Sequence, residues 1–323
     1  MTSADGRNKA SIPDKPIVSI VTVVDFDYHG GRTRETLRKT LEALAGQDFE
    51  GPVELLVCEQ AEGADTLRAE IESILPGARV VPVPARDSYS LINAGVRAAS
   101  ADIVGLVDGD CVVSSNWVRD LVDTFAEHPE IVAVSGRTTY GTASRSHRFM
   151  ALLSRSYLNP GGKKTTRFFS NNNGGMRREV WLRHPLPTDG GPYASRLQTE
   201  AIWREGGRFL FHPEMEAVHD YEGWEMERDI RRHHGYCTVH TRLRDSAIPY
   251  AWLIRLGRPA IPAIVAAKIL GGWADCLRCA RYYDVRWYEM PAVLTLAIVV
   301  HLMEVPGMML AFQGRPITDT RYR

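Results

Sequence analysis

Two carboxylates stand one residue apart, directly behind an apolar run at residues 103–107. They belong to the triplet Asp108-Gly109-Asp110. Short continuous apolar runs are typical of buried parallel strands, and ligands of open α/β sheets gather at the carboxyl ends of such strands. Paired carboxylates with a glycine between them suit an oxygen-preferring ion such as Mg²⁺ or Mn²⁺ that bridges phosphates. Asp and Gly are also common in solvated turns, so the triplet alone leaves both interpretations open.

The acidic triplet lies within an alternation of strand-like and helix-like segments, which predicts a βαβ parallel sheet. Between the strand-like runs, leucine and isoleucine recur at helical spacing. After Gly136 the alternation weakens, and Gly- and Asn-rich loops typical of binding-site loops take its place. The runs expected to be strands lie at residues 17–24, 53–57, 79–83, 103–107 and 131–134.

Length, charge and cysteine content limit the class of protein. With 323 residues, the chain is long enough for one large α/β domain plus an appendage. Lys plus Arg equals Asp plus Glu at 39 each, which argues against a general nucleic-acid partner. Residues 1–16 are polar and lack an apolar core segment, so we expect a flexible leader. Five scattered cysteines indicate reduced thiols in a cytoplasmic setting.

Four features, in this order, resemble the family-2 nucleotide-sugar glycosyltransferases. They are the strand-alternating first half, the acidic triplet, Ser-Asn-Asn-Asn-Gly-Gly-Met-Arg-Arg at residues 170–178 and Pro-Glu-Met-Glu-Ala-Val-His at residues 213–219. Their joint order and spacing are far more specific than any one motif. The resemblance covers about residues 17–244. It implies an α/β GT-A fold, which is Rossmann-like, and an inverting sugar transfer from a metal-bound nucleotide-diphosphate sugar to an acceptor.

The resemblance also implies a donor site. Carried over by position, Asp108 and Asp110 hold the metal and the donor diphosphate, and Glu59 lies against the nucleobase. His219 sits at a strand end and is either a further ligand for a Mn²⁺-class ion or a hydrogen-bonded structural histidine. A basic stretch at residues 228–234 is either a phosphate or anionic-acceptor site or a solvated helix face. Further donor contacts are assigned to Asn93, Arg231 and Arg232.

Inversion at an anomeric carbon needs a base that takes the proton of the acceptor hydroxyl. Glu200 is the first choice, because we expect it to begin a helix that leads into a strand at residues 208–211. A solvated helix glutamate is the alternative. Asp189 is the second choice.

Two apolar segments at residues 251–273 and 291–312 have the length of a bilayer-crossing helix. Both segments are interrupted by charged or polar residues. Arginines also lie in the stretch that connects the two segments, and the positive-inside rule disfavours a spanning hairpin with such a connection. We therefore expect a catalytic domain at residues 17–246 and a membrane-associated helical region at residues 247–323, lying in the cytoplasmic interface. A soluble helical appendage is the alternative. The interrupting residues are Arg255, Arg258, Lys268, His301 and Glu304.

These observations favour a membrane-associated inverting glycosyltransferase on the cytoplasmic face, using Mn²⁺ or Mg²⁺ and a lipid-linked or envelope-polysaccharide acceptor. A nucleotidyltransferase is the second interpretation. It would normally carry a Gly-rich basic phosphate loop, which residues 27–32 only faintly match. A non-catalytic, membrane-anchored carbohydrate-binding protein is the third. The sequence Cys58-Glu59-Gln60, where the resembled family has an acidic pair, favours that third interpretation.

Overall fold

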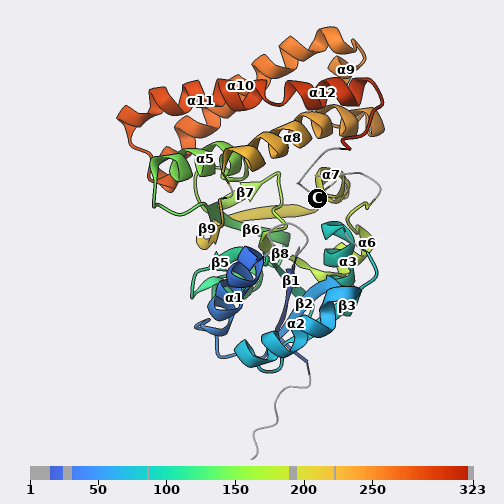
Figure 1. Ribbon diagram of the computed structural model, residues 1–323, viewed down its shortest axis with the longest axis vertical. Coiled ribbons are helices and arrows are strands. Elements are labelled where there is room, and N and C mark those ends of the chain that lie inside the picture. Colours follow the sequence, from blue (N-terminus) through green and yellow to red (C-terminus); the bar gives the residue numbers. More distant parts are fainter. Residues whose placement is uncertain (1–14, 25–30, 86, 189–194, 222, 319–323) are drawn as a thin grey trace, which may run out of the picture.

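The computed structural model describes residues 15–24, 31–85, 87–188, 195–221 and 223–318. Figure 1 shows a sheet flanked by helices in the lower body of the molecule and a layer of helices across the top. Most of the predicted flexible leader lies outside the described residues, as does Asp189.

One mixed sheet forms the core, and its first half is parallel as the sequence predicts. The order is β3-β2-β1-β4-β8-β6-β9-β5, and β7 pairs with β9. In the parallel half the strands are β1 (Val18–Val23), β2 (Val53–Gln60), β3 (Arg79–Val83) and β4 (Ile103–Asp108). The second half contains β5 (Cys111–Val113), β6 (Ile131–Thr139), β7 (Lys164–Thr166), β8 (Asn173–Arg177) and β9 (Arg208–His219).

Helices cover both faces of the sheet because alternate side chains of each buried strand point to opposite faces. In β1, Val18 and Ile20 pack on one face with the helices α1, α2 and α4, whereas Val21 packs on the other with α3, α6 and α7. The predicted α/β architecture is therefore confirmed. The bounds are α1 (Gly31–Ala45), α2 (Ala61–Ile74), α3 (Ser88–Ala98), α4 (Trp117–Glu127), α6 (Arg178–Arg183) and α7 (Ser195–Arg204).

The upper layer consists of the C-terminal helices together with α5 (Arg145–Arg155) and α8 (Trp224–Arg244) (Figure 1). Two of its helical stretches, Arg258–Tyr283 and Trp287–Phe312, are long and apolar enough to cross a membrane by length and composition. The apolar helical tail expected from the sequence is thus present. Its parts are α9 (Ala251–Ile254), η2 (Arg258–Ala260), α10 (Ile261–Cys279), η3 (Ala280–Tyr283), η4 (Trp287–Glu289), α11 (Met290–Leu302) and α12 (Val305–Phe312).

Polar contacts fasten the C-terminal helices to the preceding part of the chain. Arg137 of β6 donates to the carbonyl oxygen of Tyr282, and Arg148 of α5 pairs with the buried Glu289 at 3.0 Å. Arg278 of α10 donates to a carbonyl oxygen in the loop that follows the short helix η1 (Ser156–Leu158). Because these contacts involve three separate elements, they dock residues 278–289 of the tail against residues 137–159.

Candidate metal and donor site

The acidic triplet lies at the carboxyl end of β4, in the middle of the sheet. Asp108 is the last residue of β4 and is in register with Val23 of β1. The Gly109 amide donates to the Val23 carbonyl oxygen at 3.0 Å, and a Cβ at Gly109 would lie only 2.8 Å from that oxygen. Glycine is therefore required here, because only it lets the chain pass so close to β1 while both carboxylates project from the strand end.

A second strand brings a histidine to the same place. The short strand β5 runs antiparallel to the end of β9, and Cys111 is in register with His219. The Asp220 amide donates to the Asp110 carbonyl oxygen at 3.2 Å, which closes the pairing. The ligand atoms of Asp108, Asp110, Cys111 and His219 lie within 4.8 Å of one another. The structure thus unites three residues that the sequence analysis proposed as metal ligands.

The hydrogen bonds of His219 orient its ring for coordination. Its Nδ1 lies 2.7 Å from the Asp220 carbonyl oxygen, which can only accept, so Nδ1 carries the proton. In the neutral ring Nε2 then carries a lone pair, and this atom lies 3.5 Å from Asp110 Oδ2. A backbone carbonyl that fixes the tautomer in this way is a common feature of metal-binding histidines.

Cys111 lies in the cluster, but its sulfur is a soft ligand, whereas Mg²⁺ and Mn²⁺ prefer oxygen ligands. Burial raises the pKa of its thiol well above the ordinary value, and the neighbouring charges of Asp110 and Asp108 raise it further. Only a thiolate is a strong metal ligand. The remaining donors are carboxylate oxygens and an imidazole nitrogen, which fit an ion of the Mg²⁺ or Mn²⁺ kind.

Glu59 lies at the same edge of the sheet. Cys58 and Asp108 are both in register with Val23, on opposite sides of β1, so Glu59, the next residue of β2, lies at the level of the acidic triplet. Its carboxylate is buried and accepts from the Gln60 amide at 2.7 Å. This position is compatible with the nucleobase contact expected from the sequence.

The other three donor residues have structural partners within the protein. The Asn93 amide group binds Trp181 Nε1 and both backbone polar groups of Leu186, and it thereby ties α3 to α6 and the loop that follows. Arg231 is 2% exposed and binds Glu227 and the Ser154 hydroxyl. Arg232 lies on the same helix, α8. Their part in donor binding stays a prediction.

A cation and an aromatic group beside the cluster have no counterpart in the sequence motifs. The positive charge of Arg155, at the end of α5, acts on the Cys111 thiol and partly offsets the rise of its pKa. Its guanidinium lies 5.7 Å from the centre of the Tyr140 ring, and that ring meets His219 edge-on at 5.8 Å. Tyr221 stacks on Tyr140 at 5.3 Å. These contacts join segments far apart in the chain, so no local pattern could reveal them.

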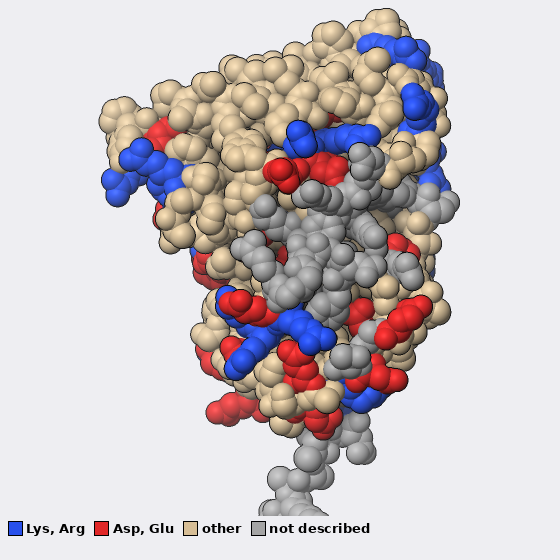
Figure 2. Space-filling model, viewed as in Figure 1, with Lys and Arg blue, Asp and Glu red and all other residues tan. Residues whose placement is uncertain are grey.

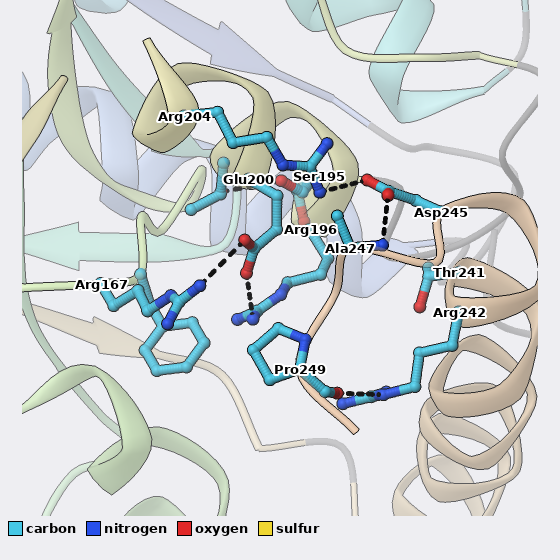
Figure 3. A network of polar contacts seen from close by, with 12 residues as sticks. Arg167, Ser195, Arg196, Glu200, Arg204, Thr241, Arg242, Asp245, Ala247 and Pro249 are labelled. Carbon is cyan, nitrogen blue, oxygen red and sulfur yellow. Dashed lines mark hydrogen bonds and ion pairs between the residues drawn. The ribbon is translucent and has the colours of Figure 1, made fainter. Parts of the chain in front are cut away.

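Glu200 has a different environment from the one expected. It lies in the middle of α7, which begins at Ser195, and is 2% exposed. One carboxylate oxygen accepts from Arg167 at 3.1 Å and the other accepts from Arg196 (Figure 3). The expectation that Glu200 begins the helix was wrong, and so was the alternative of a solvated glutamate.

The fold and this cluster together define an α/β protein with a candidate divalent-metal site at the carboxyl end of a central strand. The sequence model of the family described as Glycosyl transferase family 2 matches residues 30–182. Over these residues, just under half of the chain, the sequence is similar to the family-2 glycosyltransferases, which supports the resemblance found in its motifs.

Known proteins agree with this assignment. The mannosyltransferase PcManGT from Pyrobaculum calidifontis, solved with GDP-Man and Mn²⁺, superposes with a TM-score of 0.59 at 16% identity, over 94% of this chain and 88% of that one. GalNAc-T7 with UDP, GalNAc and Mn²⁺ gives 0.50 at 16% identity, over 74% and 52%. The glucosyl-dolichyl phosphate glucuronosyltransferase of Haloferax volcanii is 27% identical over 134 residues, which are 40% of this chain and 41% of that protein. This chain thus matches less than half the length of that relative.

Proposed function

We propose that the protein transfers a sugar from a nucleotide-diphosphate donor to an acceptor, with inversion at the anomeric carbon. The observation that carries this proposal is the convergence of Asp108, Asp110 and His219 at the carboxyl end of β4 in a GT-A sheet. Solved structures of the same fold contain a nucleotide or nucleotide sugar together with Mn²⁺. A family-2 domain over residues 30–182 adds independent support.

The proposed roles follow from these positions. Asp108, Asp110 and His219 would hold a divalent ion, which when bound neutralises charge on the leaving diphosphate. Glu59 would fix the nucleobase at the same sheet edge. The acceptor proton would go to Glu200 or Asp189, the two carboxylates proposed as base. Either must lie within about 3 Å of the acceptor hydroxyl in the productive complex.

A lipid-linked acceptor at the cytoplasmic face of the membrane is the favoured setting. The name of the Haloferax volcanii relative includes a dolichyl phosphate, which supports a lipid-linked acceptor for this chain. Five free cysteines, all buried, are compatible with a reducing compartment. Envelope polysaccharide is the second class of acceptor consistent with the fold.

A donor assay separates this function from its rivals. The purified protein is incubated with Mn²⁺ and a panel of nucleotide sugars, and release of sugar and nucleoside diphosphate is measured by chromatography. The proposal expects slow donor hydrolysis with one donor and its loss in Asp110→Asn. Exchange of labelled pyrophosphate into the donor would instead indicate a nucleotidyltransferase. Donor binding without either reaction would indicate a carbohydrate-binding protein. The control is Asp123→Asn, at an exposed position of α4.

A further inference from the structure

Three of the polar residues that interrupt the apolar tail, Lys268, His301 and Glu304, point inward and bind one another. Glu304, between α11 and α12, is completely buried, and its two oxygens face Lys268 Nζ at 2.6 Å and His301 Nδ1 at 2.9 Å. Lys268 also donates to the Thr238 hydroxyl of α8 at 3.0 Å. A charged group at the centre of a lipid-facing helix is costly, but this group faces protein on every side. The charges therefore hold α10 and α12 against α8.

Two glycines make this packing close. A Cβ at Gly307 of α12 would lie 1.7 Å from the Arg232 carbonyl oxygen, and one at Gly235 of α8 would lie 1.9 Å from the Glu304 carbonyl oxygen. The backbones of α8 and α12 therefore touch. Because α8 is a polar helix with exposed residues such as Arg228, it cannot enter a bilayer core. A helix joined to it this tightly cannot cross the membrane alone.

The opposite face of the tail is apolar and has no partner within the described residues. All exposed residues of α10 from Pro262 to Leu277 are apolar or glycine, and those of α11 are apolar apart from Thr295. The two helices pack side by side, with Trp273 Nε1 donating to the Leu294 carbonyl oxygen at 2.9 Å. The face, here called the α10–α11 face, is represented by Leu270, Ala274, Leu277, Ile298, Val299 and Leu302.

Basic and aromatic side chains stand at both ends of this face. Figure 2 shows the upper part of this layer as largely uncharged, with Lys and Arg at its two sides and a mixed group of basic and acidic residues along its lower border. At the ends, Trp252 is 63% exposed and Trp287 is 84% exposed. Within residues 251–318, the only exposed acidic side chain is Asp284. The exposed arginines are Arg255, Arg258, Arg278, Arg281, Arg286 and Arg315.

We infer that the α10–α11 face lies flat in the headgroup region of an anionic phospholipid surface and does not span the bilayer. Apolar side chains between arginine-rich, aromatic-rich ends match the chemistry of such an interface, where arginine binds lipid phosphate and tryptophan sits at headgroup level. A second copy of this chain would offer the same positive charge and would repel its neighbour at both ends. The inference goes beyond the proposed transfer reaction and does not depend on it.

Vesicle flotation tests the inference. The full chain should float with vesicles of phosphatidylcholine and phosphatidylglycerol, and much less with phosphatidylcholine alone. The double variant Leu270→Glu/Leu277→Glu should lower partition by about tenfold or more, because it puts two charges into the apolar face. Leu243→Glu is the control, since Leu243 is exposed on α8, outside this face. Donor hydrolysis in solution should be the same in all three proteins, which separates this inference from the proposed function.

Cysteine labelling tests the orientation. All native cysteines are buried, so single cysteines at the exposed Leu256 and Tyr288 report the two ends of α10. With protein added outside sealed vesicles, an impermeant maleimide should label both. Protection of one end would show a spanning helix and overturn the inference. Unchanged flotation of the double variant, or a dimer in light scattering that this variant dissociates, would overturn it as well.

Discussion

The buried carboxylate of Glu304 gives the sharpest prediction for stability. Glu304→Gln keeps the shape of the side chain but removes the charge that faces Lys268 and His301. Burial alone raises the pKa of this carboxyl, but Lys268 and His301 outweigh that effect and lower it from 4.5 to about 2. Each pKa unit corresponds to about 1.4 kcal/mol. The charged form should therefore contribute about 3 kcal/mol to the free energy of unfolding at neutral pH.

Breaking one partner of a buried pair costs about 3–5 kcal/mol, which agrees with that magnitude. The measurement is equilibrium unfolding in urea, followed by circular dichroism. The matched control is Glu42→Gln, which removes an exposed pair with Arg38 at 2.8 Å and should cost about 0.5 kcal/mol or less. If Glu304→Gln and Glu42→Gln unfold at the same urea concentration, the buried cluster does not hold the tail and the reasoning fails.

Three further predictions address pH, packing and catalysis. Because the pKa of Glu304 is depressed in the folded protein, its contribution to the free energy of unfolding should be complete above about pH 4.5 and disappear as pH falls toward 2. Glu304→Gln should therefore flatten that part of the profile of stability against pH. Gly307→Ala should destabilise the protein by about 1–3 kcal/mol through overpacking against α8. The control Gly271→Ala should be neutral or stabilising, because a Cβ at Gly271 meets nothing within 4 Å. Equal unfolding midpoints of the two variants would contradict the close contact between α8 and α12. Glu200→Gln should lower turnover by about 100-fold with donor affinity unchanged in a titration, and such a loss in Asp189→Asn alone would move the base to Asp189.

The sheet and its acidic edge were predictable because their signals are local. A continuous apolar run predicts β4, and the triplet that follows it must then lie at the strand end. The position of His219 at the end of a strand was also predictable, because its motif is the end of β9. The register between β5 and β9, which places His219 beside Asp110, could not be predicted from the sequence. Registers between distant strands depend on tertiary packing.

The tail shows where local patterns mislead. Lys268, His301 and Glu304 were interpreted as interruptions in membrane-length helices, but they form one ion cluster that faces α8. Helical periodicity describes one element at a time and carries no information on a partner helix. Similarly, Arg196 pairs with Glu200 within α7, at the i,i+4 spacing of one helix, but Arg167 comes from a separate segment, so that second buried ion pair could not be inferred from the sequence.

The central claim is that the cluster of Asp108, Asp110 and His219 binds a divalent ion. The most direct measurement is a Mn²⁺ titration followed by electron paramagnetic resonance, with and without nucleoside diphosphates. The parent protein and Asp123→Asn should bind one Mn²⁺ with the same affinity, tighter with nucleotide present. Asp110→Asn should bind at least about tenfold more weakly, because even outer-shell partners of metal ligands contribute 10–100-fold. Unchanged Mn²⁺ affinity in folded Asp110→Asn would contradict the account.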